Sequence, residues 1–203
     1  MKLYFSPGAC SLAPHIVARE LGIELELVKV DGKAKKTASG EDFWAINPKG
    51  YVPTLGLDNV EILTEGPVIT QYLADSKPGS DLAPPNGTME RVRLQELLGY
   101  INSEIHKTYS PLFSPGTTPE VRKEKEEYLK KRYALLDKQL AKGPFLTGES
   151  FTIADAYLFT VTNWARHVKV DLSDLPNLMA FQQRAGARPA VKEAMKAEGL
   201  LKE

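Results

Sequence analysis

Cysteine is scarce in this chain, because Cys10 is the only one among 203 residues. A lone thiol cannot form an internal disulfide, which excludes the disulfide-stapled class of small secreted domains and favours a reducing compartment. We therefore expect a cytoplasmic protein. Histidine is scarce too, and its three scattered residues do not match the ligand spacing of a metal site, so we expect no metal.

Excess charge and long hydrophobic runs are also missing. Twenty-six Lys and Arg balance twenty-six Asp and Glu, so no net field favours nucleic acid or an anionic membrane. Every apolar stretch is interrupted well before the roughly 20 residues that a membrane-spanning helix needs. The first residues lack the apolar core of a secretory signal. We expect neither a nucleic-acid nor a membrane partner, and binding must come from local sites.

The first 78 residues alternate between strand-like and helix-like patterns, which predicts an α/β domain. The expected segments are a strand at 2–5, a helix capped by Ser11 and ended by Gly22, a strand at 24–30, a loop from 32 to 36, a short helix at 41–47, a hairpin turning at Asp58-Asn59 and a helix starting at 64–67.

A stretch rich in proline and glycine at 78–88 predicts a linker, and helical periodicity dominates beyond it. Apolar residues recur at helical spacing over 94–105 and again over 129–140. Thr152 and Asp155 form a capping-box pattern before a strongly apolar, central helix. The expected fold is an α/β domain over 1–78 followed by an all-α domain over 88–203.

Cys10 lies where the first turn passes into a helix, so its sulfur can approach backbone N–H groups that favour the thiolate. That effect is about 0.3–1 kcal/mol, less than one pKa unit. A small buried side chain is the alternative interpretation. Ala13 stands where a C-x-x-C motif would have its second cysteine, so any disulfide partner must be an external thiol.

A polar stripe runs along the helix predicted around residue 100. At 100° per residue, Gly99, Asn102 and His106 fall within about 60° of one another, with Ser103 at the edge. The stripe could line a cleft, or it could be an ordinary solvated face. Glu104 projects about 160° away from His106, so one ligand could hardly contact both within one subunit.

Five motifs stand out along the chain, and in chain order they are S-P-G-A-C-S-L, Y-V-P-T-L, L-T-E-G-P, S-E-I-H-K and F-T-I-A-D-A-Y-L-F. Together they resemble the bacterial beta-class glutathione transferases, and the resemblance spans nearly the whole chain. It implies a thioredoxin-like N-terminal domain that binds glutathione, and a helical C-terminal domain that contributes the electrophile pocket and dimer contacts.

The resemblance implies how the first domain holds glutathione. Val52 would bind the cysteinyl backbone of the tripeptide, next to a cis peptide bond at Pro53. Glu65 and Gly66 would bind the γ-glutamyl end, which agrees with the preference of carboxylates for helix N-termini. Lys35 would reach the glycyl carboxylate, although a solvated lysine cluster is an adequate alternative.

The family pattern also extends to the reacting sulfur. Ser103 and His106 would lie near the glutathione sulfur and Cys10, and Glu104 would reach the γ-glutamyl ammonium bound in the other subunit, so the resemblance implies a homodimer. The chain departs from the family at Gly99, where an asparagine is frequent, and one polar contact is lost there.

The electrophile pocket carries no motif of its own. Tyr109, Phe113 and Trp164 are candidates to line it, with core packing as the alternative. His15 is interpreted as a helix-surface or interdomain residue, and His167 as a structural one.

The resemblance predicts a glutathione transferase of the detoxification type, with glutathione as co-substrate. Its thiolate would attack small hydrophobic or aromatic electrophiles, with Cys10 and His106 as catalytic residues. Cys10-dependent thiol–disulfide exchange or reductive dehalogenation is a second activity of the same site. The alternative is a non-catalytic protein that binds glutathione or hydrophobic ligands.

Overall fold

The computed structural model describes residues 1–77 and 79–202, and the chain forms two compact units. The first unit combines Met1–Ser80 with Ala187–Glu203, and the second is Asp81–Gly186. The predicted domain boundaries at residues 78 and 203 lie outside the described residues.

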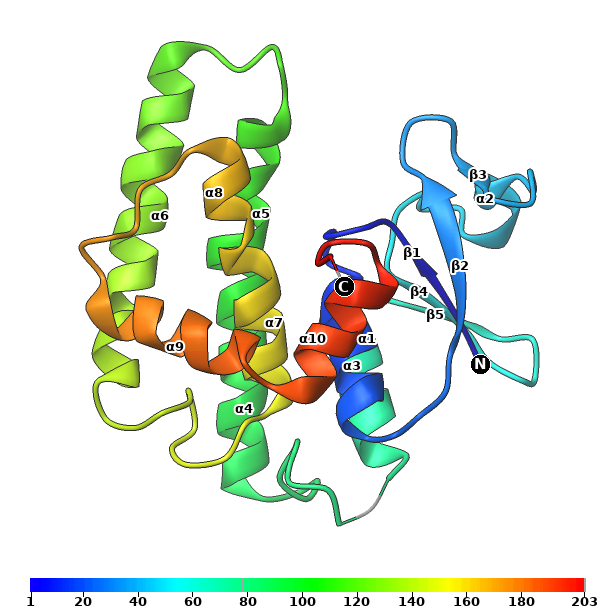
Figure 1. Cartoon of the computed structure of the whole chain (residues 1–203), viewed down its shortest axis with the longest axis horizontal. Helices are drawn as coiled ribbons and strands as arrows, with labels where there is room; N and C mark the ends of the chain where they lie inside the picture. The colour runs from blue at the N-terminus through cyan, green and yellow to red at the C-terminus, as the bar shows by residue number, and fades with distance from the viewer. Residues whose placement is uncertain (78, 203) are drawn as a thin grey trace. The chain divides into compact units, whose positions relative to one another are not determined.

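The first unit is built on a five-stranded mixed sheet with the strand order β3-β2-β1-β4-β5 (Figure 1). Strand β1 pairs in parallel with β2 and antiparallel with β4, and β4 forms the predicted hairpin with β5. The short strand β3 pairs with β2 within the segment predicted to lead into a loop. The bounds are β1 (Lys2–Phe5), β2 (Glu26–Asp31), β3 (Lys36–Thr37), β4 (Thr54–Gly56) and β5 (Ile62–Thr64).

Helices α1 (Leu12–Glu20) and α3 (Gly66–Asp75) pack together beside the sheet, and the short helix α2 (Phe43–Ile46) follows β3. Period-two alternation buries Leu3 and Phe5 of β1, and α1 buries Ile16 and Val17 on its inner face. Ser11 precedes α1, but its side chain does not cap the helix. It bonds the backbone of Ser6 instead.

The last helix, α10 (Pro189–Ala197), belongs to the first unit because it packs against α1. Ion pairs join the two helices at both ends. Arg188 binds Glu20 through two nitrogens, at 2.6 and 2.8 Å, and Glu198 binds His15 at 2.9 Å. The sequence-based division counted residues 187–203 with the helical domain, because helical periodicity shows that a segment is a helix but not which partner it packs on.

His15 is therefore not a helix-surface residue, since only 1% of it is exposed. Its Nδ1 contacts Glu198 Oε1, and Glu198 Oε2 accepts a hydrogen bond from the Gly8 N–H at 2.9 Å. The Glu198 side chain has no exposed surface. One buried carboxylate thus links α10 to α1 and to the turn before it.

The second unit is helical, as predicted. Its helices are α4 (Met89–Tyr100), the π-helical turn η1 (Ile101–His106), α5 (Lys107–Tyr109), the 3₁₀ turn η2 (Ser110–Phe113), α6 (Pro119–Leu140), α7 (Ile153–Thr162), α8 (Trp164–Val168) and α9 (Pro176–Gly186).

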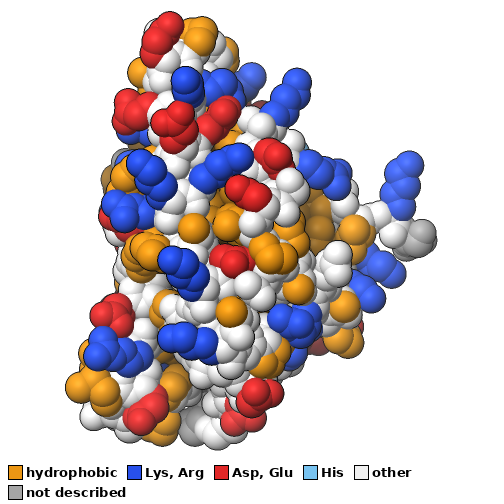
Figure 2. All heavy atoms as spheres, turned by 90° about the vertical axis from the view of Figure 1, so that its left-hand side faces the viewer, with side chains coloured by type: hydrophobic (Ala, Val, Ile, Leu, Met, Phe, Trp, Pro, Cys, Tyr) orange, Lys and Arg blue, Asp and Glu red, His pale blue; other side chains and the backbone are white. Residues whose placement is uncertain are grey.

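Helix α7 is the centre of the second unit, and all ten of its residues are buried. The predicted capping box is present, because Asp155 accepts bonds from the backbone and the hydroxyl of Thr152 at 2.8 and 2.7 Å. Figure 2 faces the side on which α6 and α9 lie and shows acidic and basic side chains intermingled there. That face carries no continuous basic stripe of the kind that binds nucleic acid.

No helix among the described residues is long and apolar enough to cross a membrane.

Glu198 gives a test of the α1–α10 contact. Replacing it by alanine removes the carboxylate that the buried His15 ring contacts and that accepts a hydrogen bond from the part-buried Gly8 N–H, so we expect Glu198→Ala to lower the free energy of unfolding by about 3 kcal/mol. Urea unfolding followed by circular dichroism measures this change. Glu193→Ala removes an exposed carboxylate from the same helix and serves as the control. Equal stability of the two variants would contradict the assigned role.

Candidate active site

Sheet register brings three loops of the first unit to the same edge of the sheet. Tyr4 pairs with Thr54, so the turn after β1 lies beside the residues before β4. Thr54 also pairs with Thr64, so the residues after β5 lie there too. These loops carry Cys10, Val52-Pro53 and Glu65-Gly66, and the first unit therefore brings these five predicted site residues together.

The Cys10 thiol lies against the second of these loops. Its Sγ donates a hydrogen bond to the carbonyl oxygen of Val52 at 3.2 Å. The Val52–Pro53 peptide bond is cis, which confirms the prediction made for this position. The ring of Pro53 is also close to Gly66, because an added Cβ at Gly66 would lie 3.6 Å from Pro53 Cγ. Cys10, Pro53 and Gly66 thus belong to one surface.

The backbone N–H groups at the helix entrance favour the Cys10 thiolate, as expected, but burial has the larger effect on the thiol. Burial raises the pKa of the Cys10 thiol to about 12, which outweighs the N–H groups of Cys10 and Ser11 that favour the anion. The negative charge of Glu65 acts in the same direction as burial. Desolvation of the sulfur anion therefore raises the thiol pKa by more than the N–H groups at the helix entrance lower it. In the unliganded protein Cys10 is a neutral thiol.

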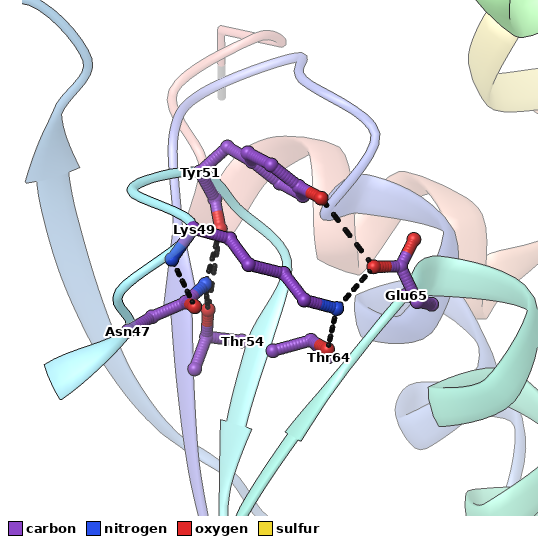
Figure 3. A network of polar contacts seen from close by, with 6 residues as sticks. All are labelled: Asn47, Lys49, Tyr51, Thr54, Thr64 and Glu65. Carbon is purple, nitrogen blue, oxygen red and sulfur yellow. Dashed lines mark hydrogen bonds and ion pairs between the residues drawn. The ribbon is translucent and has the colours of Figure 1, made fainter.

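Glu65 is the acidic group of the site, and it already binds an ammonium. Lys49 Nζ contacts its Oε1 at 2.6 Å and Thr64 Oγ1 at 2.8 Å, while the Tyr51 hydroxyl donates to the same Glu65 oxygen at 3.4 Å (Figure 3). Glu65 has a φ of 69°, an uncommon value for a residue other than glycine. It directly precedes Gly66, whose N–H opens helix α3.

The loop that carries Val52 is fixed by a buried amide. Asn47 Nδ2 donates to the Tyr51 carbonyl at 3.0 Å and to Thr54 Oγ1 at 2.9 Å, and Asn47 Oδ1 accepts from the Lys49 N–H (Figure 3). Only 1% of Asn47 is exposed. The Asn47 side chain therefore fixes the backbone conformation of this loop from its buried side.

Lys35 lies near the same loop. Its Nζ donates to the Gly50 carbonyl at 2.6 Å and lies 5.8 Å from the centre of the Trp44 ring. Gly50 has a φ of +67°, and a Cβ there would come within 2.3 Å of Trp44, so only glycine fits.

In the second unit, His106 is held by aromatic and amide groups. Its Nδ1 lies 2.5 Å from the Tyr157 hydroxyl, which also donates to Asn102 Oδ1 at 2.9 Å. The ring of Trp164 meets His106 edge to face, with centroids 4.8 Å apart. The segment is a π-helix and not the α-helix assumed for the 100° wheel, but Asn102 and His106 still share one face, as predicted.

Glu104 points elsewhere, toward α6, where it contacts Arg132 Nε at 2.8 Å and accepts a bond from the Tyr128 hydroxyl at 2.5 Å. Its divergence from His106 follows the prediction. Ser103 is exposed and donates to the Gly99 carbonyl at 3.1 Å. A Cβ at Gly99 would meet nothing within 4 Å, so the backbone leaves room for a larger residue.

The three aromatic candidates form one cluster but differ in exposure. Trp164 is 5.6 Å from both Tyr109 and Phe113, measured between ring centres. Tyr109 is fully buried and its hydroxyl contacts that of Tyr133, so it supports the cluster from within the core. Phe113 is 51% exposed.

Phe113 also borders a surface pocket of about 510 Å³ in the second unit, which Arg122, His167 and Lys169 help to line. His167, interpreted from the sequence as structural, thus lies at a pocket wall.

Lys49, Tyr51 and Tyr157 gain importance only in the structure, whereas Asn102 already belonged to the predicted polar stripe. Lys49 lies in a loop outside the five motifs, and Tyr51 begins the Y-V-P-T-L motif, whose pattern assigns no role to the tyrosine hydroxyl. Tyr157 lies within an apolar run that predicts burial, and its hydroxyl was the one available sign of a polar role. Among the described residues no group of three or more His, Cys, Asp or Glu is placed to hold a metal ion.

Two family models match the chain. The model for the glutathione S-transferase N-terminal domain matches residues 1–75, and that for the C-terminal domain matches residues 100–189. The glutathione S-transferase GstA of Escherichia coli O157:H7 is 46% identical over 200 residues, covering 98% of this chain and all of that protein. The chain belongs to the glutathione S-transferases.

Solved structures place this glutathione transferase in the beta class. A bacterial beta-class glutathione S-transferase from Sphingomonas chungbukensis is 47% identical, with a TM-score of 0.95, and the match covers 99% of this chain and all of that one. A sphingomonad glutathione S-transferase complexed with glutathione matches with the same identity, coverage and TM-score. The thioredoxin-like and helical fold predicted from the sequence is thereby confirmed.

The neutral state of Cys10 in this transferase gives a pH-dependent prediction. Only the thiolate is alkylated, so with a pKa near 12 the rate of iodoacetamide modification should keep rising about tenfold per pH unit from pH 8 to pH 10. Mass spectrometry of the intact protein measures the rate, and Cys10→Ala gives the background. A rate that levels off below pH 9 would contradict the assigned neutral thiol.

Proposed function

We propose that this glutathione transferase joins the sulfur of glutathione to an electrophilic carbon of small hydrophobic or aromatic compounds. The glutathione thiol loses its proton, the resulting thiolate forms a carbon–sulfur bond, and a leaving group such as halide departs with the bonding electrons. The convergence of Cys10, Val52-Pro53 and Glu65-Gly66 at one sheet edge is the observation that carries the proposal.

The geometry of the first unit suits a tripeptide with charged ends. Glu65 already binds the ammonium of Lys49 at 2.6 Å, so its carboxylate is oriented to receive the γ-glutamyl ammonium. The ion pair is exposed on both sides, with each side chain 46% accessible, so exchanging one ammonium for another costs little. The N-terminus of α3 at Gly66 suits the carboxylate of the same end, and Lys35 suits the glycyl carboxylate.

The extended middle of the tripeptide needs backbone partners. Val52 follows a loop that Asn47 fixes, and its neighbour Pro53 begins the approach to β4. We assign Val52 and Pro53 to the cysteinyl part of glutathione, which would bring its sulfur toward Cys10.

The second unit supplies the remaining predicted groups. We assign His106 to the glutathione sulfur, with Ser103 nearby, and Phe113 and Trp164 to the electrophile. Both aromatic rings belong to the cluster that also contacts His106. Tyr109 supports this cluster from the core without lining the pocket.

Conjugation takes precedence over chemistry at Cys10 itself. In exchange with oxidised glutathione, the Cys10 thiolate would attack one sulfur and release one glutathione thiolate. A pKa of about 12 leaves little Cys10 thiolate at neutral pH, so we propose this exchange and reductive dehalogenation as secondary activities of the same site. The comparisons give no support to the non-catalytic alternative.

The proposal is tested by following glutathione-dependent turnover of an activated aryl halide. Glu65→Gln removes the charge that answers the ammonium, so we expect the KM for glutathione to rise at least tenfold while kcat changes little. The control is Glu61→Gln, an exposed carboxylate four residues away that contacts Asn59. Wild-type turnover no faster than the uncatalysed reaction would contradict the proposal and favour a non-catalytic protein that binds glutathione or hydrophobic ligands.

We also propose that the protein acts as a homodimer in the cytoplasm, in the detoxification of electrophiles. Within one chain Glu104 faces α6 and His106 faces α7. We therefore propose that the two residues contact different glutathione molecules. The Glu104 carboxylate is 30% exposed. A second copy of the chain would supply the glutathione that Glu104 contacts.

The dimer yields a separate prediction. Sedimentation velocity at micromolar concentration should give the mass of two chains. In the dimer, Glu104→Gln should raise the KM for glutathione, while Glu96→Gln, an exposed carboxylate paired with Arg93 on α4, should not. A monomeric sedimentation coefficient would refute the role assigned to Glu104.

A further inference from the structure

The His106 ring is tied to a chain of hydrogen bonds that ends on Asn102. Nδ1 of His106 lies 2.5 Å from the Tyr157 hydroxyl oxygen, and that oxygen lies 2.9 Å from Asn102 Oδ1. Tyr157 comes from α7 and is 1% exposed. Asn102 and His106 come from the same π-helical turn.

The direction of these bonds follows from counting protons. An amide oxygen has no proton to give, so the single hydroxyl proton of Tyr157 must point to Asn102. The tyrosine oxygen can then only accept from His106, and the proton of this second bond must come from Nδ1. In a neutral imidazole with its proton on Nδ1, the other nitrogen, Nε2, is the proton acceptor.

We propose that Tyr157 and Asn102 are positioning residues that hold neutral His106 as the Nδ1–H tautomer, which makes Nε2 the atom that accepts a proton. This inference rests on the proposed function, in which His106 acts on the glutathione thiol. Nε2 would take that proton, and the resulting imidazolium N–H would then donate to the thiolate. The ring therefore serves as a base first and as a donor afterwards.

The surrounding elements prevent the ring from turning over to reverse the assignment. Trp164 of α8 packs edge to face on His106 at 4.8 Å, and Tyr157 does so at 5.8 Å. The π-turn adds a constraint from the backbone, where the Lys107 N–H bonds the Asn102 carbonyl five residues earlier. Because this turn is wide, the Asn102 amide and the His106 imidazole both reach the Tyr157 hydroxyl.

The assignment is tested by nitrogen NMR of the histidine rings in the complete, unliganded protein labelled with ¹⁵N, at a pH where the rings are neutral. His106→Gln identifies which signals belong to His106 among the three histidines. We expect wild-type His106 to show a protonated Nδ1 and an unprotonated Nε2. A protonated Nε2 in the wild type would overturn the proposal.

Three variants test which groups set the tautomer. Tyr157→Phe and Asn102→Leu remove the bonds that fix the proton, and losing one such bond should shift the tautomer ratio about fivefold toward Nε2–H. Asn102→Asp keeps an acceptor that cannot donate, so it should retain the wild-type tautomer. The matched control is Tyr100→Phe, which removes a tyrosine hydroxyl that bonds the Arg132 carbonyl just before the π-turn. Unchanged His106 signals in Tyr157→Phe would overturn the proposal.

Turnover separates this proposal from the proposed function. Tyr157→Phe should lower kcat about fivefold and leave the KM for glutathione near the wild-type value, because the variant changes a proton position and not a binding contact. If the NMR result holds but His106→Gln turns over like the wild type, the role of His106 in the proposed function fails while the tautomer assignment stands. If kcat falls in Tyr157→Phe without any change of tautomer, the positioning role is refuted.

Discussion

The pairing of β1 with β4, and of β4 with β5, is the constraint on which the site of the first unit depends. Antiparallel pairing places the end of one strand beside the start of the next, so the register Tyr4–Thr54–Thr64 brings three loops to one edge. A shift by one residue would turn Leu55 out of the core and displace Val52-Pro53 from the Cys10 sulfur. The core and the site are therefore fixed by the same hydrogen bonds.

Cys10 and Glu65, the two titratable groups at this sheet edge, differ in their exposure to water. Cys10 is partly buried, and its pKa rises because a sulfur anion is poorly solvated there. Glu65 and Lys49 are exposed, so their ion pair is weak enough to exchange its cation. The first unit thus combines a protonated thiol with an accessible carboxylate. In the second unit, His106 has aromatic and neutral surroundings, through Tyr157, Trp164 and Asn102.

Much of the candidate site was predictable because it lies in motifs with strict local geometry. The sequence predicted the cis bond at Pro53 through the family resemblance, the hairpin before Glu65 through its turn residues, and the Thr152–Asp155 capping box through its spacing. It did not reveal Lys49 or Tyr157 as partners of Glu65 and His106, because each pair depends on contacts between segments far apart in the chain. The helical wheel assumed an α-helix where the structure has a π-turn, because a π-turn has no distinctive residue pattern, but its grouping of Asn102 with His106 holds.

The amino-acid sequence by itself determined the order of the elements, their amphipathic faces and the family, since periodicity and turn chemistry act over a few residues. Tertiary structure alone decided that α10 packs against α1, that His15 is buried against Glu198, and that Cys10 is a neutral thiol. Burial is a property of the assembled fold, and neither the accessibility of a side chain nor its remote partner is written in the residues beside it. The raised pKa of the Cys10 thiol follows from that burial.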